Sequence, residues 1–175
     1  MDLSAFYGAF SPACFALLGL WLVAVQVRLA AWEKDPERRR RSYGVALHFA
    51  LPGMMSMFAL IDTQTSVFWR TSFGIVAVSG VVVMATVRGF PVPRGHDQAG
   101  TRQLPAADRF GLAAYVAAIM LYVLIGVLAV LGGLSALRTE AVLQTLLVFL
   151  GFNVAWLLLL DDRKPSPVRP AAKAE

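Results

Sequence analysis

The sequence contains few of the residues with which soluble domains and metal sites are built. Only 15% of its 175 residues are charged, whereas a typical soluble domain has about 25%. A single cysteine, Cys14, excludes an intrachain disulfide and a paired-cysteine metal site, and we expect it to be a small apolar packing residue. The motifs G-x-x-x-x-G-K-[ST], G-x-G-x-x-G and His-Glu-x-x-His are all missing. We therefore predict no catalytic site, no metal and no bound cofactor, and an enzyme is not the expected class.

Long apolar stretches make up most of the chain instead, and 58% of the residues are hydrophobic. About 18 or more apolar residues are needed to cross the roughly 30 Å hydrocarbon core of a bilayer. Five stretches meet this length: residues 5–30, 43–62, 67–88, 109–135 and 141–160. The sequence thus predicts an all-α polytopic membrane protein, with one domain of five transmembrane helices over residues 1–160 and a disordered cytoplasmic tail over residues 161–175.

A cleaved secretory signal is the alternative for the first stretch. Such a signal has a basic segment before a shorter apolar core. Here Asp2 is the only charged side chain before the core, and the apolar stretch is too long. We therefore expect a true first span.

The basic residues lie almost entirely in alternate connections. Fourteen of the sixteen Lys and Arg residues fall in segments 28–43, 88–109 and 161–175, and only Arg70 and Arg138 fall on the other side. Because basic residues are retained in the cytoplasm, we expect the N-terminus outside and the C-terminus inside. The charge is then a topology and lipid signal, so nucleic acid is not an expected partner. The bias toward Arg and Ala is typical of high-GC bacterial genomes, which favours a bacterial inner membrane.

Four consecutive arginines, Arg38, Arg39, Arg40 and Arg41, precede the second span. Asp35 before Pro36 is typical of an N-cap followed by proline at the first helical position, so we expect the helix to start there. The arginines then lie at the headgroup level, as contacts for anionic lipid or as plain topological retention signals.

The second span has one polar, small-residue face. At 100° per residue, Ser56 lies at the border of a stripe that consists of Gly44, His48, Pro52, Met55, Ala59 and Asp62. The opposite face is apolar. We therefore expect the stripe to face protein or water and not lipid.

His48 admits three interpretations. It is a neutral histidine bonded to a neighbouring helix, a proton acceptor or gate, or a haem or metal ligand. The last has little support, because the other histidine, His96, lies in the predicted loop of residues 89–108.

Arg70 lies near the start of the third span, beside Trp69 and across a short turn from Asp62. One interpretation is an anion-attracting residue at a pore mouth. The other is an interfacial ion pair with Asp62, in which Trp69 is a headgroup anchor. Gly74 and Ala77 are expected to let another helix approach closely.

The remaining spans carry few polar groups. Pro12 predicts a kink in the first helix. In the fifth span, Gln144 and Asn153 lie on opposite faces, so at least one of them is expected to bond another helix. No carboxylate falls within the central half of any predicted span, which argues against a proton-driven carrier.

Two functions remain open. The first is a structural or accessory subunit of a membrane complex, packed against a partner through small-residue seams. The alternative is a homo-oligomeric channel or small-solute pore in which the face that contains His48, Pro52, Ser56, Asp62 and Arg70 lines the lumen. The expected partners are the lipid bilayer, with anionic lipids, and another membrane protein or further copies of the chain.

Overall fold

In a computed structural model, the described residues of the chain form five helices. The structure describes residues 2–32, 36–61, 66–88, 106–132 and 136–161. The helices are α1 (Leu3–Trp32), α2 (Pro36–Ile61), α3 (Ser66–Arg88), α4 (Ala106–Leu131) and α5 (Ala136–Asp161). The predicted disordered tail lies outside the described residues, and so do residues 89–105 of the predicted loop.

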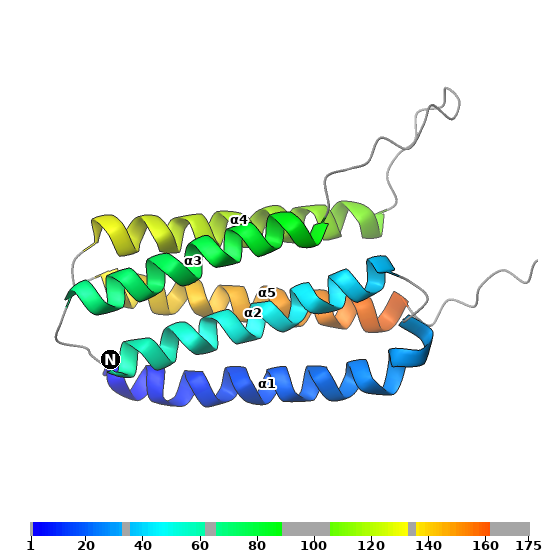
Figure 1. Cartoon of the computed structure of the whole chain (residues 1–175), viewed down its shortest axis with the longest axis horizontal. Helices are drawn as coiled ribbons and strands as arrows, with labels where there is room; N and C mark the ends of the chain where they lie inside the picture. The colour runs from blue at the N-terminus through cyan, green and yellow to red at the C-terminus, as the bar shows by residue number, and fades with distance from the viewer. Residues whose placement is uncertain (1, 33–35, 62–65, 89–105, 133–135, 162–175) are drawn as a thin grey trace, which may run out of the picture.

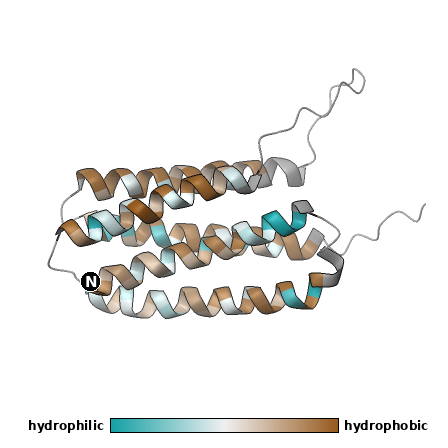
Figure 2. Cartoon of the chain, viewed as in Figure 1, coloured by the Kyte–Doolittle hydropathy of each residue, from teal (hydrophilic) through white to brown (hydrophobic). Residues whose placement is uncertain are grey.

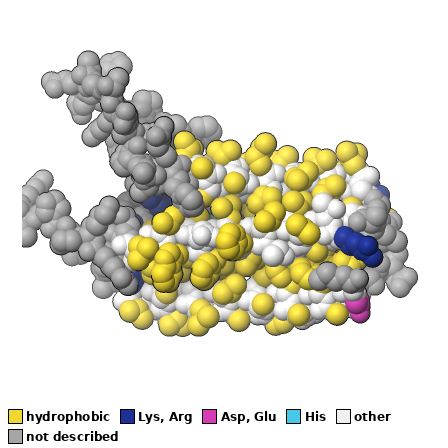
Figure 3. Space-filling model, turned by 180° about the vertical axis from the view of Figure 1, so that it is seen from behind, with side chains coloured by type: hydrophobic (Ala, Val, Ile, Leu, Met, Phe, Trp, Pro, Cys, Tyr) yellow, Lys and Arg dark blue, Asp and Glu magenta, His cyan; other side chains and the backbone are white. Residues whose placement is uncertain are grey.

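All five helices are long and apolar enough to cross a membrane, as a multi-pass membrane protein requires. Figure 2 shows mostly hydrophobic residues along the helices. In the face shown in Figure 3, coloured charged side chains lie near the two ends of the bundle and apolar ones cover its length. Large apolar side chains, such as Val27 and Leu20, are exposed on the outside. The surface is therefore one that suits lipid.

The helices form a bundle in which α2 and α5 are central (Figure 1). α2 contacts α1, α3 and α5, while α5 also contacts α4 and a small part of α1. The main core joins residues from all five helices, and a smaller cluster around Trp21, Val45 and Phe49 joins α1, α2 and α5. α2 is the most buried of the five.

Among the described residues, Pro12 and Pro52 lie inside helices. Pro36 begins α2, as predicted, whereas Pro12 and Pro52 fall within α1 and α2, and both helices continue through them. One turn after Pro52, the Ser56 hydroxyl lies 2.9 Å from the Pro52 carbonyl oxygen of the same helix.

α1 packs on α2 through backbone groups. The Ser11 hydroxyl donates to the Gly53 carbonyl at 3.2 Å, and the Trp21 indole donates to the Ser42 carbonyl at 3.0 Å. A Cβ at position 53 would lie 3.1 Å from the Cβ of Cys14. Cys14 is buried in this contact, as expected for a small packing residue.

Candidate functional site

The polar face of α2 points into the bundle. Gly44, His48, Pro52, Met55 and Ala59 are all buried, so these five members of the stripe lie in the interior of the chain. Its sixth member, Asp62, lies outside the described residues.

His48 is held between its own helix and α5. Its Nδ1 lies 2.7 Å from the Gly44 carbonyl oxygen, and because a carbonyl only accepts, this bond places a proton on Nδ1. A Cβ at Gly151 of α5 would lie 2.4 Å from the Cβ of His48, so the two backbones approach closely here. Nε2 is buried and bonds to nothing in the described part of the chain.

Ser56 of α2 and Gln144 of α5 form a second contact between these helices, about two turns beyond His48 along α2. The Ser56 hydroxyl lies 3.0 Å from Oε1 of Gln144 and 2.9 Å from the Pro52 carbonyl. A hydroxyl has one proton, so its donation is shared between these two acceptors. Gln144 thus bonds another helix, whereas Asn153 donates to the Phe149 carbonyl of its own helix.

Glu140 is the buried group that sequence reasoning missed. Helix α5 begins at Ala136, five residues before the predicted span, so Glu140 lies inside the helix. Its side chain has no exposed surface, and neither carboxylate oxygen has a described partner. The spacing of Glu140 and Gln144 could have predicted this burial, since residues four apart lie on the same face of a helix.

The surroundings of Glu140 contain further polar groups. The Tyr7 hydroxyl of α1 donates to the Leu137 carbonyl at 3.0 Å, less than one helical turn from Glu140. Nε1 of Trp69 and Nε2 of Gln144 are buried donors without described partners. Several buried polar atoms at this end of the core therefore have no described hydrogen-bond partner. Burying a polar group without a hydrogen bond is costly in an apolar interior.

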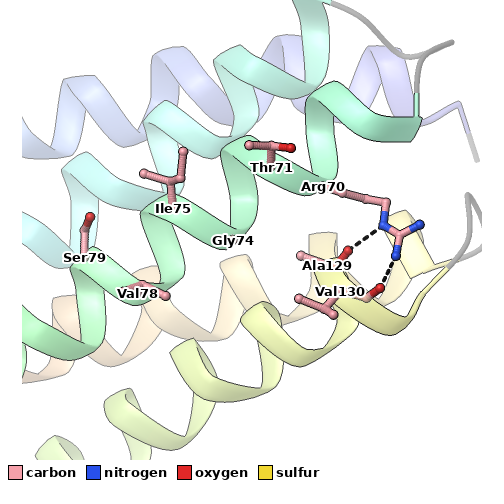
Figure 4. Close-up of a pocket in the computed structure, with 8 residues that line it drawn as sticks. All are labelled: Arg70, Thr71, Gly74, Ile75, Val78, Ser79, Ala129 and Val130. Carbon is pink, nitrogen blue, oxygen red and sulfur yellow. Dashed lines mark hydrogen bonds between the residues drawn. The ribbon is translucent and has the colours of Figure 1, made fainter.

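Among the described residues, Arg70 contacts the end of α4. Its guanidinium donates to the carbonyl groups of Ala129, at 2.8 Å, and Val130 (Figure 4). These carbonyls belong to the last turn of α4, where they have no partner within their own helix and where a positive charge is favourable. Arg70 is thus a cap for α4, and its predicted pair with Asp62 involves a residue outside the described part.

A groove runs beside Arg70 along the side of the bundle. Its volume is about 560 Å³, and α3 and α4 line it with eight residues: Arg70, Thr71, Gly74, Ile75, Val78, Ser79, Ala129 and Val130. Gly74 was expected to pack against another helix, but a Cβ there would meet no atom within 4 Å. Ala77 does pack, since a Cβ at Gly126 would lie 3.5 Å from it.

The arginine run lies at the opposite end of the bundle from Arg70, on the first turns of α2. Arg38 is half-buried, and Arg39, Arg40 and Arg41 are exposed. In the described ranges, no three His, Cys, Asp or Glu side chains are grouped so that they could hold a metal ion.

The sequence matches no family model, and neither a curated protein nor a solved structure shows significant similarity to it. Any function must therefore be inferred from the geometry of the chain itself.

Proposed function

We propose that this chain is a structural or accessory subunit of a membrane complex, packed against a partner through the outer face of α1. The exposed small-residue stripe of α1 is the observation that supports this function most directly. The proposed location is a bacterial plasma membrane, with the N-terminus outside and the C-terminus in the cytoplasm.

The two faces of α1 differ in character. The face toward α2 carries Tyr7, Cys14 and Trp21, all buried. At 100° per residue, the opposite face carries a continuous stripe of small or compact residues, all exposed: Ala5, Ala9, Pro12, Ala16 and Gly19. A Cβ at Gly19 would meet no atom within 4 Å.

A stripe of this kind suits a helix better than it suits lipid. Between membrane helices, small residues allow the backbones to approach and to gain close van der Waals contact. α1 is also the least buried of the five spans, so a large part of its surface is available to a partner. We infer that a transmembrane helix of the partner packs along this stripe.

The proposed orientation rests on charge. Fourteen of the sixteen basic residues fall in the segments assigned to one side, and basic residues are retained in the cytoplasm. Among the described residues, the exposed Arg39 to Arg41 lie at that end, whereas Arg70 lies at the other.

The channel hypothesis has less support from the geometry. In the single chain, His48 and Ser56 are covered by neighbouring helices, so a lumen lined by them would need α2 to separate from α5. Their contacts with Gly151 and Gln144 oppose that separation.

The test is purification of the full chain from its own host in mild detergent, followed by native mass spectrometry. We expect a stoichiometric second polypeptide. The double variant Ala9→Leu/Ala16→Leu, which fills the stripe, is expected to lose it. Gly74→Leu is the matched control, because it adds bulk at an open position on α3 and should keep the partner.

Two outcomes would overturn the proposal. One is recovery of the chain alone as a closed homo-oligomer. The other is a partner that remains bound equally well to the filled stripe and to the control, since the α1 face would then not be the contact.

A further inference from the structure

The groove between α3 and α4 has the length of one membrane leaflet. From Arg70 to Ser79 the chain advances nine residues, about 14 Å at 1.5 Å per residue, and half of a roughly 30 Å hydrocarbon core is about 15 Å. Arg70 lies one turn from the start of α3. The charged end of the groove is thus at the level of the headgroups, and the remainder extends toward the middle of the bilayer.

Below Arg70 the groove is lined mainly by apolar side chains, together with Thr71 and Ser79, and its floor is open at Gly74. Ile75, Val78 and Val130 expose 62%, 63% and 63% of their surfaces. Gly74 leaves space between them, since nothing lies within 4 Å of the position of a Cβ. Figure 4 shows Ile75 and Val78 along α3 and Val130 on α4. A flexible apolar chain fits this shape.

Arg70 provides a fixed positive charge at the upper end. Its two described hydrogen bonds go to uncharged carbonyls, so they orient the guanidinium without neutralising it. A guanidinium has five N–H donors in a planar fork, and those not used by the carbonyls match the oxygen atoms of a phosphate.

We propose that this groove binds one anionic phospholipid, with its phosphate at Arg70 and one acyl chain along Gly74, Ile75 and Val78. The positive charge of Arg70 favours an anionic headgroup. The groove favours a lipid over free phosphate, because free phosphate would leave the apolar part of the groove unoccupied. The site lies at the opposite end of the bundle from Arg38 to Arg41. It is therefore independent of the lipid contacts expected there and of the partner proposed for α1.

Native mass spectrometry of the purified full chain tests this proposal. Phosphatidylglycerol, phosphatidylcholine and inorganic phosphate are added separately, and the lipid-bound fraction is followed with increasing collision energy. We expect one phosphatidylglycerol to be retained at least about tenfold better than phosphatidylcholine, and no retained phosphate.

Two variants probe the two ends of the site. Gly74→Leu fills the groove and is expected to abolish retention of either lipid, whereas Gly8→Leu, equally open but on α1 and outside its small-residue stripe, should have no effect. Arg70→Gln is expected to remove the preference for phosphatidylglycerol.

The proposal is overturned if Gly74→Leu retains lipid as the unaltered chain does, or if the two lipids bind equally well to the unaltered chain. Retained inorganic phosphate would indicate a free-anion site instead. Because Arg70 also caps α4, Arg70→Gln could impair folding; the Gly74→Leu comparison remains decisive in that event, since it leaves the cap in place.

Discussion

His48 lies directly against Gly151, and this contact brings the backbones of α2 and α5 together at the level of the imidazole. A Cβ at position 151 would be 2.4 Å from the Cβ of His48 and 3.2 Å from its Cγ. Neither atom is the far end of a flexible side chain. Room for a larger residue can be made only if one helix moves.

Gly151→Ala is therefore expected to destabilise the bundle. Forcing extra atoms into a well-packed contact typically costs about 1–3 kcal/mol, which exceeds the gain of about 1 kcal/mol from replacing glycine within a helix. Gly8→Ala is the control, since a Cβ there meets no atom within 4 Å, and it should be neutral or stabilising. Thermal or SDS-induced unfolding measures both, and equal effects at the two positions would contradict this packing.

The hydrogen bond between Ser56 and Gln144 should appear as an energetic coupling. In a double-mutant cycle, Ser56→Ala and Gln144→Leu are expected to show a coupling free energy of about 0.6–2 kcal/mol, the range measured for bonds between membrane helices. Ser56→Ala with Asn153→Leu serves as the reference pair, because Asn153 bonds within its own helix. Additive effects in the first pair would show that the two side chains do not bond.

Glu140→Gln is expected to raise the stability of the bundle at neutral pH. Both carboxyl oxygens are buried without described partners. The group must therefore either carry an uncompensated charge or take up a proton at neutral pH, and either state costs more than an amide of the same shape. We expect a gain of about 1 kcal/mol or more by chemical unfolding. Asp2→Asn, at an exposed carboxylate that accepts from the Ser4 backbone N–H, should change stability little, because asparagine is an equally good N-cap. A loss of stability in Glu140→Gln would point to a partner for the carboxylate.

Thiol accessibility separates the subunit and channel hypotheses. In a Cys14→Ala background, cysteine at position 44, 56 or 59 is expected to resist a small water-soluble maleimide, because all three positions are buried. Ser4→Cys, at the exposed start of α1, should react. Rapid labelling at any of the three buried positions would instead support the channel hypothesis, in which the His48 face lines the lumen.

Hydropathy and periodicity predicted much of this structure. All five helices correspond to predicted spans, because apolar length is a property of the sequence alone. The inward direction of the face that contains His48 also followed from its 3.6-residue period. Orientation in the membrane, partner and function remain predictions, since no contact within the chain depends on them.

The contacts between helices were not predictable in the same way. Glu140 was placed just outside the fifth span, which was predicted to start at residue 141, whereas α5 begins at Ala136. The partners of Arg70 are backbone carbonyls of α4. Every residue has a backbone carbonyl, so the sequence does not show which ones will accept a hydrogen bond. Gly74 was assigned to packing for its small size, but whether a small residue is covered or leaves a groove depends on which helix lies opposite.

The position of α5 in the bundle also has a consequence for biosynthesis. The ribosome makes α5 after the other four helices, yet α5 supplies Gln144 to Ser56 and Gly151 to His48. Until α5 is in place, His48 and Ser56 on α2 lack the helix that covers them. A chain stalled or cut before α5 would therefore leave these two side chains without their contacts on α5, so completion of synthesis and concealment of these groups coincide.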